Sequence, residues 1–464
     1  MLSLKEFLRI EVVPALGCTE PGAVALAAAR ARCELWPDAE ITRVVVRVSE
    51  SIYKNGMDVG IPGAMGGRGN ALAAALGAIA GKAGCSLEAL RDCSPADVDI
   101  AKSWLAQGKV DLSCVPGVQG VYVECTIETK DHRATCVISQ SHSHIERVTL
   151  DGRVVFDGNA GGQPAPGGDG AVSVDPEPSA EIEAEMRTMT FESVMSLAED
   201  MDLDDVDYIM SGVEMNKAIA EYGLRDESVS GLGLGRAVLS MIRDKRLEND
   251  LMFRIRSYAS AASDARMAGA KMPAMSAVGS GNQGIAAILP VALLGEALGK
   301  SRVDIARGVA MSVLTTSFIR ARTGRLAPIC GSAVAAGAGA AVGMTWLMGG
   351  TIDQAANAMR TMLSATAGIV CDGAKGSCAL RIGSVASEAY LAALMALKDK
   401  GVTIPQGVVD DSLEITTDNL GILNKDGMKD VDAVIIRILE ARGKYASMSR
   451  TRVTGVNADE EDHK

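Results

Sequence analysis

The spacing of apolar residues changes along the chain. Between residues 41 and 53, Val44, Val46 and Val48 alternate with other residues, which predicts a strand. Further alternating stretches follow a predicted helix at 95–107, and they lie at 110–114, 120–128, 132–139 and 145–156. Short strands grouped beside a helix indicate a compact α+β module.

Helical periodicity dominates the remainder of the chain. An amphipathic pattern predicts a short helix at 2–13. Thr19 or Glu20 as an N-cap, with Pro21 in the first turn, predicts a second helix that extends to about residue 35. The chain after the strand-rich module is again helical, and its many glycines and alanines permit close approach between helices.

These patterns together predict an α+β fold with two parts. The larger part is a mainly helical domain that is discontinuous in sequence and comprises residues 1–84 and 180–464. The smaller part is an inserted α+β module at 85–179, which ends in a Pro/Gly-rich connector that begins at Asn159.

Composition excludes some classes of function. The chain has 464 residues, enough for two or three domains, and its formal net charge is -12. It carries no basic cluster and no interleaving of basic with aromatic residues, so we expect no nucleic-acid partner. Ten cysteines without the regular spacing of a secreted scaffold indicate reduced thiols and a cytoplasmic location.

Two stretches imitate membrane signals. Ala15-Leu-Gly-Cys18 loosely resembles a lipoprotein cleavage box, but charged residues interrupt the segment before it, which argues against a signal peptide. The run from Ile329 to Gly350 is uncharged and long enough to span a bilayer. Because it is rich in glycine and alanine and has no basic flank or aromatic belt, we predict a buried helix and no membrane partner.

Three cysteines stand out in the most apolar part of the sequence. Cys330 precedes one predicted helix, Cys371 ends another that begins near Ile352, and Cys378 opens a third. Thiolates are soft ligands that suit iron-sulfur clusters or zinc. Three of them would leave a cluster with one open iron, although cysteine is also a common small core residue.

Cys18 lies beside the predicted start of a helix. The helix dipole and free backbone N–H groups at such a position lower the pKa of a thiol. We therefore predict that Cys18 is a base or nucleophile. The alternative interpretation is a buried cysteine in a helix-entry turn.

Several polar residues are candidates for holding a small ligand. Lys54 and Asn55 follow the predicted strand and could hold a carboxylate and an amine, although such pairs are also ordinary turn residues. Ser280, Asn282 and Gln283 open a helix, where backbone N–H groups favour anions.

The histidines and the remaining cysteines give weaker signals. His142 and His144 would share one face of a strand, which with no third ligand nearby is a weak zinc signal and fits a substrate-facing or surface pair better. The cysteines of the strand-rich module show no CxxC spacing, so we interpret them as structural.

The motifs resemble those of a known family over essentially the whole chain. They are Ala15-Leu-Gly-Cys-Thr-Glu-Pro21, Lys54-Asn55 followed by Ile61-Pro-Gly63, Gly281-Asn-Gln-Gly284, Ile329-Cys-Gly331 and Cys371-Asp-Gly-Ala-Lys-x-x-Cys378. This combination resembles the L-cysteine desulfidase family, whose core is related to the alpha subunit of iron-sulfur L-serine dehydratases. The motif of Cys18 and the three-cysteine motif are specific when they occur together.

The resemblance implies a chemistry. It implies an oxygen-sensitive [4Fe-4S] cluster held by Cys330, Cys371 and Cys378, with Cys18 near the open iron. Family members break L-cysteine into pyruvate, ammonia and sulfide without pyridoxal phosphate. The helical domain would then be catalytic, and Cys18 as a thiolate would take the α-proton.

The substrate of such an enzyme is a small amino acid. The candidates for holding its carboxylate and amine are Lys54, Asn55, Ser280, Asn282 and Gln283, with His142 a weaker one. A homodimer is a further expectation.

Two other functions remain open. One is an L-serine dehydratase with the same cluster, and the other is a non-enzymatic metal or redox-sensing helical protein. The related serine dehydratases carry a cysteine near the C-terminus, whereas no cysteine follows Cys378 here, which favours the desulfidase. Lys54 or Lys375 could form a Schiff base with pyridoxal phosphate, but no surrounding signature supports it.

Overall fold

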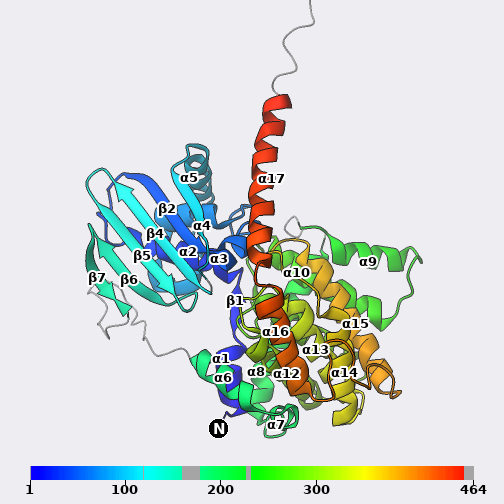
Figure 1. The fold of residues 1–464 in the computed structure, drawn as a ribbon. Helices are drawn as coiled ribbons and strands as arrows, with labels where there is room; N and C mark the ends of the chain where they lie inside the picture. The colour runs from blue at the N-terminus through cyan, green and yellow to red at the C-terminus, as the bar shows by residue number, and fades with distance from the viewer. Residues whose placement is uncertain (1, 119, 159–177, 226–230, 454–464) are drawn as a thin grey trace, which may run out of the picture.

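The protein is described here by a computed structural model that covers residues 2–118, 120–158, 178–225 and 231–453. Two units lie side by side, a sheet module and a larger helical unit (Figure 1). The fold is α+β and mainly helical, as the sequence predicts. The predicted Pro/Gly-rich connector falls at 159–177, outside the described residues.

The sheet module is a mixed six-stranded sheet with helices packed against it. The strands follow the order β3-β2-β4-β5-β6-β7, and only the β2–β3 pair is parallel. Its elements are α2 (Thr19–Arg32), β2 (Ile41–Ser49), α3 (Glu50–Gly56), α4 (Asn70–Ala80), η1 (Ala83–Glu88), α5 (Pro95–Ala106), β3 (Val110–Val115), β4 (Tyr122–Thr129), β5 (Arg133–Ser139), β6 (Ile145–Leu150) and β7 (Arg153–Asp157).

The core of the sheet module begins earlier in the sequence than the boundary at residue 85 that we predicted. Val44, Val46 and Val48 of β2 are fully buried in this core, together with alanines of α2 and α4. Because β2 lies between β3 and β4, it cannot belong to the helical unit. The module therefore takes in α2, β2 and α4, which periodicity alone assigned to the larger domain.

Two of the predicted strands have different bounds in the structure. The strand predicted at 41–53 ends at Ser49, whose hydroxyl donates to the carbonyl of Gly120, and α3 begins at Glu50. Lys54 and Asn55 therefore lie on a helix and not in a turn. The stretch at 145–156 is the hairpin β6–β7, because Asp151, with a φ of 49°, and Gly152, with a φ of 80°, form a tight turn.

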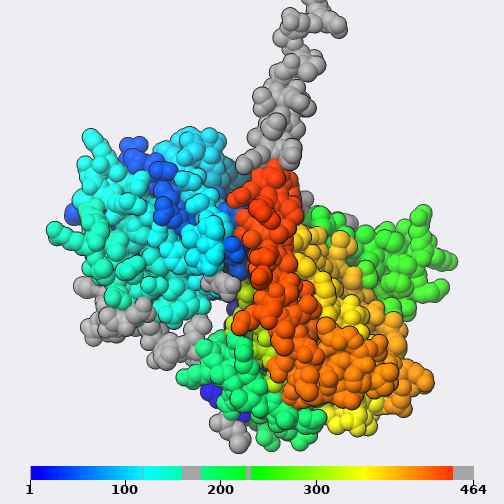
Figure 2. Space-filling model, viewed as in Figure 1, coloured from blue at the N-terminus to red at the C-terminus, as the bar shows by residue number. Residues whose placement is uncertain are grey.

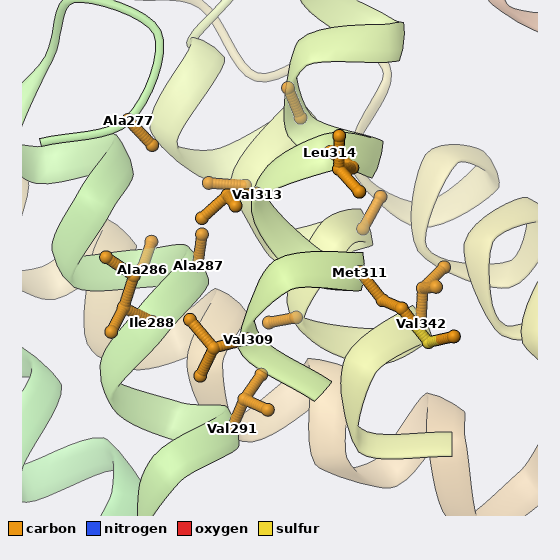
Figure 3. Close-up of a cluster of buried hydrophobic side chains, with 14 of the residues drawn as sticks. Ala277, Ala286, Ala287, Ile288, Val291, Val309, Met311, Val313, Leu314 and Val342 are labelled. Atoms are coloured by element: carbon orange, nitrogen blue, oxygen red, sulfur yellow. The ribbon is translucent and has the colours of Figure 1, made fainter. Parts of the chain in front are cut away.

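The helical unit contains the larger hydrophobic core. Its elements are α1 (Leu4–Glu11), β1 (Pro14–Leu16), α6 (Pro178–Thr188), α7 (Phe191–Ser196), α8 (Leu203–Leu224), α9 (Leu234–Arg243), α10 (Leu251–Met267), β8 (Pro273–Met275), α11 (Gly281–Ala297), α12 (Arg302–Thr323), α13 (Gly331–Leu347), α14 (Ile352–Thr366), α15 (Cys378–Ala396), α16 (Leu413–Ile422), η3 (Leu423–Gly427) and α17 (Val431–Val453). Figure 3 shows small and branched side chains of α11, α12 and α13 interlocking in this core.

Glycines allow α12 and α13 to pack closely. A Cβ on Gly339 would lie 2.3 Å from the carbonyl oxygen of Ser312, and one on Gly343 would lie 2.4 Å from that of Gly308. Those separations are far inside van der Waals contact, so only glycine fits at either position. Close packing of small residues is what the Gly/Ala-rich sequence predicts.

The apolar run at 329–350 forms α13, and most of its side chains are buried inside the helical unit. Among the described residues one helix, α15, is apolar and long enough to cross a membrane, and its most apolar window is 50% buried. Core helices of globular proteins have the same properties, so this is weak evidence for a membrane span.

Strand β1 of the helical unit pairs with β8 just before the chain crosses into α2 of the sheet module. The two units also contact each other directly, since the Gly60 N–H of the sheet module donates to the carbonyl of Met267 at the end of α10. On the other side, Lys54 of α3 forms a buried ion pair with Asp432 of α17, 2.6 Å between Nζ and Oδ1. Figure 1 shows α17 passing α3 and extending away from the body. Figure 2 shows the two units as lobes with a hollow between them.

Candidate active site

A cavity of about 620 Å³ lies between the two units. The sheet module contributes the start of α2, Asn55 of α3 and the β5–β6 turn, which carries His142. The helical unit contributes the N-termini of α11, α13 and α15 and side chains of α10 and α12. The cavity therefore collects residues that are far apart in the sequence.

The three cysteines of the apolar region line this cavity together. The segments before α13 and after α14 pair through two hydrogen bonds, from the Cys330 N–H to Ile369 and from the Cys371 N–H to Pro328. This pairing brings the Cys330 and Cys371 thiols into hydrogen-bond contact. Cys378 is the first residue of α15, and its Sγ lies 3.7 Å from the carbonyl oxygen of Gly373.

Cys371 does not end a helix as predicted. Helix α14 ends at Thr366, so Cys371 follows the helix by several residues and lies in an extended segment. The hydrogen bond from Cys330 lowers the pKa of Cys371 and raises the pKa of Cys330 itself. Together the two thiols lose a first proton easily and a second with difficulty.

The donor set fits an iron-sulfur cluster. Three soft thiol donors line the same cavity, and Arg381 and Arg320 supply positive charge beside them. Within the described ranges, no three His, Cys, Asp or Glu side chains are grouped so that they could hold a single metal ion.

Cys18 is the N-cap residue of α2 and lines the same cavity. Its Sγ donates a hydrogen bond to Glu20, 2.9 Å from Oε2. Burial and the negative charge of Glu20 raise the pKa of this thiol well above its usual value, although Arg266 opposes them. The predicted lowering of the Cys18 pKa by the helix terminus is therefore wrong, because a carboxylate and burial outweigh the dipole.

Glu20 is a site residue that sequence reasoning treated only as a helix cap. Its Oε1 accepts from the Asn55 amide at 2.9 Å, and its Oε2 accepts from Cys18 and from the Thr19 hydroxyl. Burial by itself raises the pKa of the Glu20 carboxyl. The charge of His142 and the hydrogen bonds from Cys18 and Asn55 together have a larger effect in the opposite direction, so the pKa of Glu20 lies below its usual value. A buried carboxylate is thus stable here.

Three buried or half-buried arginines were also missed. Each of them has at least one guanidinium nitrogen that is buried without a hydrogen-bond partner in the structure. These atoms are Nε of Arg266, Nε and Nη1 of Arg320, and Nη1 of Arg381. All three line the cavity. They lie within helices, so no local sequence signal distinguished them from surface arginines.

The other predicted residues divide into two groups. Ser280, Asn282 and Gln283 line the cavity at the start of α11, and the Gln283 Oε1 is buried without a hydrogen-bond partner. His142 lines it too, from the β5–β6 turn and not from a strand as predicted. Lys54 does not line the cavity, because its ammonium group turns to Asp432.

Comparison with known proteins identifies the class. The family model described as serine dehydratase alpha chain matches residues 124–437. The chain belongs to this family, which is generally iron-sulfur dependent and whose description indicates a lyase. The relation to serine dehydratase alpha chains that the motifs predicted is therefore confirmed.

Relatives match nearly the whole chain. A UPF0597 protein of Kosmotoga olearia is 40% identical over 96% of this chain and 100% of its own length. One of Nitratidesulfovibrio vulgaris is 42% identical over 94% of this chain and 99% of its own. One of Clostridioides difficile is 37% identical over 95% of this chain and 99% of its own.

Proposed function

We propose that the protein is an iron-sulfur-dependent lyase that eliminates sulfide from L-cysteine and yields pyruvate and ammonia. The observation that carries the proposal is that three thiols and a Cys18–Glu20 pair line one cavity. A β-elimination needs a proton acceptor for the Cα–H and an electrophile for the leaving group; the Cys18–Glu20 pair can provide the first, and a cluster held by the three thiols would provide the second.

The cofactor belongs to the proposal. Cys330, Cys371 and Cys378 would hold a [4Fe-4S] cluster. When bound, the cluster supplies a Lewis acid for the departing sulfur or oxygen atom. The chain's part is to fix the three thiols and to provide neighbouring N–H groups and positive charge.

The buried arginines support recognition of an anionic ligand. A Cβ on Gly281, the first residue of α11, would lie 2.4 Å from Arg266 Nε, and one on Gly331, the first residue of α13, would lie 2.9 Å from Arg320 Cζ. Each guanidinium therefore packs against a helix N-terminus. That end of a helix already attracts anions and repels cations, so two buried cations there are stable only with negative charge nearby.

The two arginines face different partners. Burial lowers the pKa of Arg320 to about 10, and the neighbouring thiols Cys330 and Cys371 act in the opposite direction, so this arginine balances the cluster ligands. Arg266 donates to the carbonyl of Gly17 beside Cys18. We assign the substrate carboxylate to Arg266, which lies against the start of α11 and lines the cavity.

Replacing Arg266 tests that assignment. In Arg266→Gln we expect kcat/KM to fall about 10- to 150-fold, mainly through KM, because a charge-assisted hydrogen bond contributes about 1.5–3 kcal/mol. Arg266→Lys, which keeps the charge, should recover part of the loss. The matched control is Arg254→Gln on the exposed face of the same helix. Steady-state kinetics of the Arg266→Gln protein within about twofold of wild type would refute the assignment.

The leaving group decides between the two lyase candidates. The family description itself favours L-serine as the alternative substrate. Anaerobically purified protein should release sulfide and pyruvate from L-cysteine faster than pyruvate from L-serine, measured side by side. Faster turnover of L-serine would make the protein a serine dehydratase, and turnover of neither would favour the non-enzymatic, metal or redox-sensing alternative.

Three further properties are part of the proposal: the substrate as partner, the location and the oligomeric state. The partner that we propose is the small amino-acid substrate, and the proposed location is the cytoplasm. The homodimer considered from the sequence also stays a prediction.

A further inference from the structure

We propose that Glu20 and Cys18 work as a two-member proton relay, in which Cys18 receives the α-proton of the substrate while it passes its own proton to Glu20. This inference rests on the proposed function and assigns a role to a residue that neither the motifs nor the family description assigns. Glu20 acts through Cys18, so it is a positioning and proton-accepting residue.

The geometry holds the pair ready for transfer. The Cys18 thiol already points its proton at Glu20 Oε2, 2.9 Å away. The Asn55 amide fixes the other carboxylate oxygen, also at 2.9 Å. Both Cys18 and Glu20 line the cavity, so the hydrogen-bonded pair borders the space where a ligand fits.

The electrostatics explain why a relay is needed. Burial and Glu20 raise the pKa of Cys18, so a free thiolate is rare near neutral pH. Glu20 is the anionic member, since His142, Cys18 and Asn55 together lower its pKa despite burial. Its place in the first turn of α2 favours the same charge. A thiol that gives up its proton as it gains another avoids the unfavourable thiolate.

The step is balanced in atoms and electrons. The Cα–H bond breaks and an S–H bond forms at Cys18 Sγ, while the original S–H bond breaks and an O–H bond forms at Glu20 Oε2. The electron pair of the Cα–H bond becomes the second bond between Cα and Cβ, and the leaving group departs from Cβ with the pair of its own bond. Glu20 is left as a neutral acid, which must release its proton before the next cycle.

Two measurements on the anaerobic holoprotein test the relay. The first is the pH dependence of Cys18 alkylation by iodoacetamide, followed by mass spectrometry of the peptide that contains it. Because the charge and the hydrogen bond of Glu20 both raise the thiol pKa, Glu20→Gln should move the alkylation profile to lower pH. The second is turnover, in which Glu20→Gln should lose about 100- to 10,000-fold in kcat with little change in KM.

Two further variants control for structure. Glu20→Asp keeps a carboxylate and should recover more kcat than Glu20→Gln, and it also serves if the Gln variant fails to fold. Glu40→Gln removes an exposed carboxylate of the same module and should leave both measurements at wild-type values.

The outcomes separate the relay from the proposed function. A shifted alkylation profile together with a large loss of kcat supports the relay. Wild-type kcat in Glu20→Gln overturns it, whether or not the profile moves, and leaves the lyase proposal standing. An unshifted profile also overturns it, because the thiol would then have no functional contact with the carboxylate. Wild-type protein that turns over neither amino acid overturns both.

Discussion

Cys371→Ala protein should emerge from anaerobic purification without the broad absorption near roughly 400 nm that thiolate-ligated iron clusters show, and its sulfide release from L-cysteine should fall to background. The physical reason is that the surroundings of Cys371 favour its thiolate form. Its hydrogen bonds with Cys330 and with the N–H of Gly373 lower the pKa of this thiol. Loss of one of three ligands leaves two, too few to retain the cluster.

A second cysteine provides the control. Cys33 is exposed at the end of α2 and lies outside the cavity, so Cys33→Ser should keep both absorption and activity. Iron and acid-labile sulfide content, measured on both variants, would show whether colour follows cluster occupancy. Undiminished sulfide release by Cys371→Ala would remove the cluster from the mechanism.

Cys18→Ser should keep the absorption of the wild-type protein but lose about 100- to 10,000-fold in kcat. A serine hydroxyl fits the same place and can donate to Glu20, so folding and the carboxylate position should persist. A hydroxyl is a much weaker acid than a thiol, however, and its proton passes to a carboxylate at far greater cost. Turnover should therefore fail at the proton step.

Absorption and single-turnover kinetics, measured on the same preparation, separate two roles of Cys18. Retained colour with a slow first turnover supports a proton-transfer role. Colour lost together with activity would instead make Cys18 a fourth ligand of the cluster.

The sequence predicted those features that local chemistry determines. Capping residues and apolar periodicity predict helix starts at Gly331 and near Pro21, and the structure has both. Because cysteines at helix ends can converge, the grouping of Cys330, Cys371 and Cys378 was also a reasonable inference, and all three line one cavity. Their roles as ligands stay a prediction.

Features that depend on distant contacts were missed. The pKa of Cys18 was predicted in the wrong direction because a helix terminus is visible in sequence, whereas the orientation of the Glu20 carboxylate is not. Lys54 was assigned to substrate, but its partner Asp432 is 378 residues away along the chain. Arg266 and Arg320 could not be distinguished from other helical arginines without knowing which helix ends they approach.

The candidate site is built from residues of both units of the protein. The thiols belong to the helical unit, whereas Cys18, Glu20 and the β5–β6 turn with His142 belong to, or border, the sheet module. Neither lobe alone would assemble a complete site. Substitutions in the β5–β6 turn can therefore change the lining of the cavity without changing the three cysteines, so selection for a different small ligand could act on this turn alone.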